Sequence, residues 1–115
     1  MTELREKVWQ ELLEGKQTKE QLINIIRVVI DLRKKAGQEV LKRNPTKEEL
    51  ICIMQYVFSL RETAWQNFLE KKPTNKELCD VITFVPSLRD KAGKRLLNQD
   101  PTNDDKIFIL KHRQY

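Results

Sequence analysis

The chain has 115 residues, of which 34% are charged and 39% hydrophobic, with only three glycines and four prolines. This length suits one domain, and the composition favours a helical soluble domain over a disordered chain or a β-sandwich. The 22 basic and 17 acidic residues give a net charge of +5, which favours an acidic partner but falls short of a dense nucleic-acid-binding tail.

Two features of the sequence indicate where in the cell the protein is expected to be. The two cysteines, Cys52 and Cys79, do not share a position of the sequence repeat described below, so we expect no disulfide framework. The longest apolar stretches, 22–32 and 50–60, are too short to span a bilayer, and no signal-like apolar region follows the charged first residues. We therefore expect a cytoplasmic protein with reduced thiols and no membrane partner.

The dipeptide Leu-Arg recurs every 28 residues, at positions 4, 32, 60 and 88. A period in the range of roughly 20 to 50 residues is typical of repeat architectures, in which each unit buries its apolar face against its neighbours. The chain is therefore predicted to form a single domain, 1–115, of four repeats: 4–31, 32–59, 60–87 and 88–115.

Each unit begins with a predicted helix, named helix A, of about eleven residues. In the first unit its apolar side chains share one helical face. They are Leu4, Val8, Trp9, Leu12 and Leu13. A small polar residue stands just before each later Leu-Arg pair, and we predict that it caps the helix. These residues are Asp31, Ser59 and Ser87.

A break ending in threonine follows helix A, and it contains proline in the last three units. An acidic residue or glutamine lies three residues after each threonine. This is the pattern of a capping box at the start of a second helix, helix B, in all units but the last, where aspartate departs from it. The four pairs are Thr18 and Gln21, Thr46 and Glu49, Thr74 and Glu77, and Thr102 and Asp105.

Helix B carries an aliphatic stripe at i, i+3, i+4 and i+7, as in Leu22, Ile25, Ile26 and Val29. Helix B is also apolar around more of its circumference than helix A, so we expect it to form the inner layer. The predicted unit is a helix-turn-helix hairpin across the break. Four units give an all-α fold of about eight short helices, stacked as a short α-solenoid or a compact superhelical stack.

Two departures from the repeat are informative. Pro86 is predicted to end the third helix B, whereas Ile30 occupies a junction without glycine or proline, which leaves a kink or a loop open there. In the last unit, Lys106 and Arg113 replace apolar residues of the stripe. The last repeat is therefore predicted to be a polar C-terminal cap.

Trp9, Gly37, Trp65 and Gly93 occupy one position of the repeat and alternate between large and small. We favour a packing role, in which each indole fills the space left by the glycine of an adjacent unit. The alternative is a pair of exposed tryptophans that contact a ligand.

No catalytic residues, metal site or cofactor are predicted. The single histidine, His112, does not complete a triad or a zinc-binding set with Cys52 and Cys79, and no phosphate-binding glycine loop occurs. Carboxylates fall at helix starts and on polar faces, where capping and solvation account for them.

The candidate ligand-binding residues are the arginines at the head of each unit, together with two lysines. They are Arg5, Arg33, Arg61, Arg89, Lys35 and Lys91. A cation in the first turn of a helix opposes the macrodipole, so its recurrence suggests a specific partner. We favour pairing of each guanidinium with a carboxylate of a neighbouring repeat, and the alternative is a ladder that binds an acidic peptide or phosphate.

The motif Leu-Arg-x-x-Ala-Trp/Gly-x-x-x-Leu, followed by Pro-Thr and an acid, resembles in its hairpin organisation the α-solenoid class that includes tetratricopeptide and HEAT-type repeats. This resemblance implies a non-enzymatic scaffold that binds a protein or peptide, with self-association into a homodimer as an alternative. A different class of function is nucleic-acid or phosphate binding through a basic edge. That edge would comprise the arginines with Lys34, Lys35, Lys42, Arg43, Lys91, Lys94 and Arg95.

Overall fold

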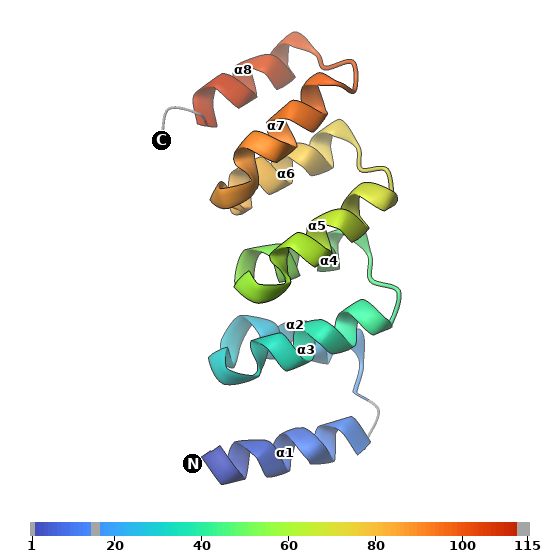
Figure 1. The fold of residues 1–115 in the computed structure, drawn as a ribbon, viewed down its shortest axis with the longest axis vertical. Helices are drawn as coiled ribbons and strands as arrows, with labels where there is room; N and C mark the ends of the chain where they lie inside the picture. Colours follow the sequence, from blue (N-terminus) through green and yellow to red (C-terminus); the bar gives the residue numbers. More distant parts are fainter. Residues whose placement is uncertain (1, 15–16, 113–115) are drawn as a thin grey trace.

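The computed structural model describes residues 2–14 and 17–112, and within them the fold is all-α, with eight α-helices and three short 3-10 helices (Figure 1). The α-helices are α1 (Thr2–Glu14), α2 (Lys19–Val28), α3 (Arg33–Lys42), α4 (Lys47–Tyr56), α5 (Arg61–Glu70), α6 (Asn75–Phe84), α7 (Arg89–Leu97) and α8 (Asn103–His112). The 3-10 helices are η1 (Ile30–Leu32), η2 (Phe58–Leu60) and η3 (Pro86–Leu88). None of these helices combines the length and the apolar character needed to cross a bilayer.

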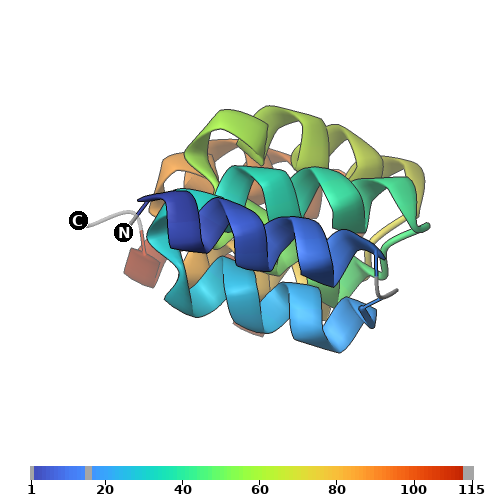
Figure 2. The same cartoon turned by 90° about the horizontal axis from the view of Figure 1, so that it is seen from below.

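The helices form an elongated stack that measures 51 × 27 × 18 Å. Its radius of gyration is 16.1 Å, larger than the roughly 13 Å expected of a compact globule of this length. Figure 2 views the stack from its N-terminal end, where α1 and α3 lie in one layer and α2 lies in the other. The helices of type B pack on one another in the order α2, α4, α6, α8, as the predicted inner layer requires.

The tightly packed hairpins are not the predicted ones, in which helices A and B of the same unit pair across the break. Each tightly packed hairpin joins helix B of one unit to helix A of the next, as α2 to α3, α4 to α5 and α6 to α7. The reason lies in the connections. A 3-10 helix of three residues reverses the chain tightly between B and A, and the same turn forms at all three junctions, with or without proline.

The Pro-Thr break makes a wider connection. The residue before each proline adopts a left-handed conformation, with φ of 51° at Asn44, 53° at Lys72 and 54° at Asp100. Asparagine and aspartate tolerate this conformation better than lysine does. Helix A therefore ends with a left-handed residue at each proline-containing break, and the chain is redirected into the next helix B.

The predicted caps of helix A are wrong. Asp31, Ser59 and Ser87 lie inside the 3-10 helices, and the N-cap residue of each following α-helix is a leucine without a side-chain capping bond. Carbonyl groups of the 3-10 turn accept the first amides instead, as when the Arg33 N–H donates to the Ile30 oxygen. A polar cap is therefore not needed at this junction.

The capping boxes of helix B are confirmed. The Gln21, Glu49 and Glu77 amides donate to the hydroxyl oxygens of their threonines at 3.1 to 3.2 Å, and their side chains accept from the threonine amides. Asp105 makes the same two bonds with Thr102, at 3.0 and 3.1 Å. The shorter aspartate therefore serves as well as glutamate in the last box.

The core contains the stripe of helix B and the apolar face of helix A. Trp9 and Trp65 are buried within it, so the indoles pack inside the fold and the alternative of an exposed pair is wrong. The predicted contact with glycine is also wrong. A side chain at Gly37 would meet Leu60 and Val57, and one at Gly93 would meet Ile109, so aliphatic side chains pack where the indoles were expected.

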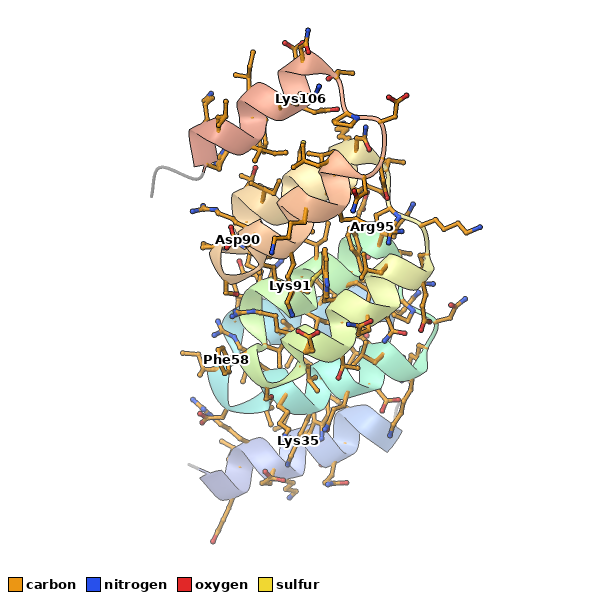
Figure 3. The ribbon with its side chains drawn as sticks, turned by 45° about the horizontal axis from the view of Figure 1, so that its top comes forward. Lys35, Phe58, Asp90, Lys91, Arg95 and Lys106 are labelled. Carbon is orange, nitrogen blue, oxygen red and sulfur yellow. The ribbon has the colours of Figure 1, made fainter. Side chains whose placement is uncertain are left out.

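The last helix departs from the repeat as the sequence predicts. Lys106, which stands at the position of the buried Leu22, is exposed (Figure 3). Leu110 is exposed as well, although its equivalents Ile26 and Ile82 are buried. Arg113, the other predicted polar substitution, lies outside the described residues.

Candidate functional site

Three of the four predicted arginines bind the end of the preceding helix B. The Nε of Arg33 donates to the Ile26 carbonyl oxygen at 2.6 Å, and Arg61 bonds to Met54 at the same distance. Arg89 bonds to Ile82 at 2.8 Å. Each acceptor is the third residue from the end of α2, α4 or α6, where carbonyl groups lack a partner within the helix.

This contact places each guanidinium in a favourable field at the end of the preceding helix. The guanidinium lies at the start of helix A, where the macrodipole opposes it, but it also lies against the negative end of helix B. The Arg33 Nη2 donates a second bond, of 3.0 Å, to the Arg27 carbonyl oxygen. The Arg33 and Arg61 guanidiniums also lie 5.3 and 5.1 Å from the ring centroids of Tyr56 and Phe58.

At Arg5 the predicted pairing with a carboxylate of a neighbouring repeat is replaced by a pairing within one repeat, because Nη1 contacts Asp31 of the same unit, 4–31. For Arg33, Arg61 and Arg89 the recurrent partner is a backbone carbonyl, so that prediction is corrected for these three. The sequence does hold a signal: the spacing of seven residues between each arginine and a stripe residue of the preceding helix. In a continuous helix, residues seven positions apart are two turns apart. Here the 3-10 turn reverses the chain between them, so the arginine side chain reaches the carbonyl of the stripe residue.

The two predicted lysines form ion pairs between helices of type A. Lys35 of α3 lies 2.9 Å from Glu6 of α1, and Lys91 of α7 lies 2.9 Å from Glu62 of α5. Figure 3 shows Lys91 on the side of α7 that faces α5. The hydrogen bond from Lys91 holds the pKa of the Glu62 carboxyl below its usual range. The lysines therefore connect successive units and lie apart from the carbonyl contacts of the arginines.

A second row of ion pairs joins the starts of successive B helices. Lys19 lies 3.1 Å from Glu49, and Lys47 lies 2.8 Å from Glu77. Burial opposes ionisation of both glutamates, but the lysines and the capping-box threonines outweigh it, so the pKa of each carboxyl is lowered. The capping acids thus serve two purposes, since they cap their own helix and bind the preceding one.

An open apolar groove of about 640 Å³ lies at the N-terminal end of the stack, between α1 and α2. We call it the end groove. Its walls are lined by Leu4, Arg5, Val8, Leu12, Ile25, Val28, Val29, Ile30, Asp31 and Leu32. Leu4 is 63% exposed, whereas its equivalent Leu32 is 7% exposed. Val8 is 45% exposed, whereas its equivalent Ala36 is fully buried.

Sequence reasoning missed the end groove, because it placed Leu4, Val8 and Leu12 on a face that the repeat itself covers. The repeat covers that face only where another unit precedes it, and α1 is the first described helix. The available signal was the direction of stacking. Helix A packs against the helix B that comes before it, and among the described residues α1 has no such helix before it.

A shallower groove of about 430 Å³ runs across the B helices α2, α4 and α6. It is lined by Arg27, Glu48, Ile51, Cys52, Gln55, Tyr56, Asp80 and Phe84. Burial raises the pKa of the Cys52 thiol, and the neighbouring Arg27 only partly offsets this. The thiol is therefore held in its neutral form, and polar and apolar side chains are mixed in this groove.

Comparison of the chain with models of known protein families, with curated proteins and with solved structures finds no match. The class of protein is therefore defined by the fold itself, an all-helical stack of hairpins with an uncovered apolar groove at one end.

Proposed function

We propose that this protein is a non-enzymatic scaffold of the α-solenoid type, similar in architecture to tetratricopeptide and HEAT-type repeats, and that it binds a protein partner in the end groove. One observation carries the proposal. Leu4 and Val8 expose an apolar surface at positions that are buried in every other unit. A contiguous apolar surface of this kind marks interaction sites on soluble proteins, whereas scattered exposed side chains do not.

The contacts of the basic residues favour a protein ligand over phosphate. The Nε atoms of Arg33, Arg61 and Arg89 already donate to carbonyl oxygens, and Lys35 and Lys91 are in ion pairs. In the basic edge predicted for nucleic acid, Arg43 also bonds to Gln17 and Arg95 to Gln99. A phosphate backbone would have to compete with these contacts.

Affinity capture from extracts of the source cell tests the proposal, with the full chain as bait. The wild-type bait should retain a protein that the Leu4→Asp bait loses and the Leu110→Asp bait keeps. Leu110 is a matched control, because it is 66% exposed and lies at the opposite end of the stack. Identical capture by all three baits, or no capture, would contradict the proposal.

Binding to nonspecific duplex DNA, measured by fluorescence anisotropy at increasing salt, separates the other class of function. Steeply salt-dependent binding that is indifferent to Leu4→Asp would favour the basic edge. The proposal predicts no such binding at low salt.

A further inference from the structure

We propose that the end groove accepts an amphipathic α-helix of a partner protein, in the place that helix B of a preceding unit occupies elsewhere in the stack. This inference rests on the proposed function and specifies the chemistry of the partner. The chain contains three copies of the same interface, in which α3 packs along α2, α5 along α4 and α7 along α6.

The first wall of the groove is the face of α1 that corresponds to these interfaces. In the second unit the face consists of Leu32, Ala36 and Val40, all of which are buried. The equivalent residues of α1 are Leu4, Val8 and Leu12, and all three line the end groove. α1 therefore presents the surface that binds a helix in the rest of the chain.

The second wall comes from α2. Ile25 and Val29 line the groove and are only partly buried, whereas their equivalents Ile53 and Val57 are buried in the second unit. Within the chain, α2 packs against α4. An incoming helix would pack against the opposite side of α2, as α2 itself packs against α4. The repeat thus fixes the direction of the bound helix, antiparallel to α1 and parallel to α2.

Arg5 supplies a polar contact at the end of the bound helix. Its equivalents use Nε to bind the third carbonyl from the end of helix B. Arg61 makes this bond and at the same time donates from Nη1 to Ser87, 26 residues later, at 2.9 Å. Arg5 already makes the corresponding contact from Nη1 to Asp31, also 26 residues later. Its Nε is therefore placed for the carbonyl of an incoming helix.

The chemistry of the bound helix follows from α2, whose Leu22 and Ile26 are completely buried and which packs against α3 and α4. The ligand should carry aliphatic residues with this spacing and end beside Arg5. A second copy of this chain fits less well, because α8 presents the exposed Lys106 at the position of Leu22. Because the stripe of α8 is interrupted by this lysine, we infer that the helix comes from a different protein.

The test uses a fluorescent peptide of residues 18–31, the segment that contains α2, with the full chain as receptor. A lactam between Glu20 and the lysine of an Asn24→Lys substitution, both on the exposed face, keeps the peptide helical, and circular dichroism verifies this. Saturable binding is expected, with at least a tenfold loss for receptor Leu4→Asp and a several-fold loss for Arg5→Gln. Receptor Leu110→Asp should bind as the wild type does.

A control peptide with Leu22→Glu and Ile26→Glu should not bind. Absence of binding by the helical peptide, or equal binding to the Leu4→Asp receptor, would overturn the inference. Concentration-dependent dimerisation abolished by Leu4→Asp would also overturn it, in favour of a second copy as occupant. If cell-derived capture depends on Leu4 while the peptide does not bind, the helix inference fails and the proposed function stands. If the peptide binds in a Leu4-dependent way while capture from cells does not depend on Leu4, the proposed function fails and the helix-binding groove stands.

Discussion

The Nε of Arg61 donates a hydrogen bond of 2.6 Å to the carbonyl oxygen of Met54, seven residues earlier in the chain. The bond closes the 3-10 turn between α4 and α5 and places a positive charge at the end of α4. Because the same bond recurs at Arg33 and Arg89, the most regularly repeated cation of the sequence holds the hairpins together.

Replacing Arg33 or Arg61 with glutamine should lower the free energy of unfolding by about 1 to 2 kcal/mol, since each substitution removes a charge-assisted bond to a helix end. Urea denaturation measures the effect. Lys34→Gln is the matched control, because it removes the same charge from an exposed neighbour of Arg33 and should change stability little. Unchanged stability of the arginine variants, together with lost ligand binding, would contradict this structural role and support the arginines as ligand-binding residues.

The ion pairs of Glu49 and Glu77 should make stability depend on pH. Their folded pKa values are lowered, so the pairs contribute stability above the pKa of an unfolded glutamate, about 4.3. This contribution is lost as the pH falls through the lower folded values.

The double variant Glu49→Gln and Glu77→Gln tests this pH dependence, because glutamine keeps the capping box, as Gln21 does in the first unit. The variant should lose about 0.5 kcal/mol per pair at pH 7. Thermal melts across pH should show the difference from the wild type disappearing below the folded pKa values. A constant difference down to acid pH would assign the loss to capping.

The two helical glycines should respond differently to alanine. At Gly93 a Cβ would make an ordinary contact of 3.7 Å with Ile109, so the gain in helix propensity should stabilise the fold by about 0.5 to 1 kcal/mol. At Gly37 a Cβ would come within 2.9 Å of Leu60, a buried side chain, which should cancel that gain or reverse it. Equal melting-temperature changes for the two variants would show that Leu60 moves aside freely.

Lys72 carries a left-handed backbone with φ of 53° after the end of α5. Lys72→Asn should stabilise the protein by about 0.5 kcal/mol, because asparagine tolerates this conformation and occupies it at Asn44. Chemical denaturation measures the gain, and Lys71→Asn, one residue earlier with φ of −85°, is the control expected to give none. A loss of stability in the Lys72 variant would contradict this explanation.

Local patterns predicted the elements of this fold, because capping boxes and apolar stripes depend on residues three to seven positions apart. Thr46 with Glu49 is an example, predicted from spacing alone and present in the structure. The prediction paired the wrong helices. Asp31 and Ser59 have the side chains of helix caps, but in the structure they lie inside 3-10 turns that join helix B to the next helix A. The end groove depends on which neighbour covers Leu4, and that is a property of the stacking order and not of any local pattern.

The most direct measurement is photo-crosslinking in the source cell, with a photoreactive amino acid in place of Val8 in one sample and of Leu110 in another. Both side chains are exposed, but only Val8 lines the end groove. We expect crosslinks from position 8 to a partner protein, within a helical segment, and none to that protein from position 110. No crosslinked protein at position 8, or the same products from both positions, would contradict partner binding at the end groove.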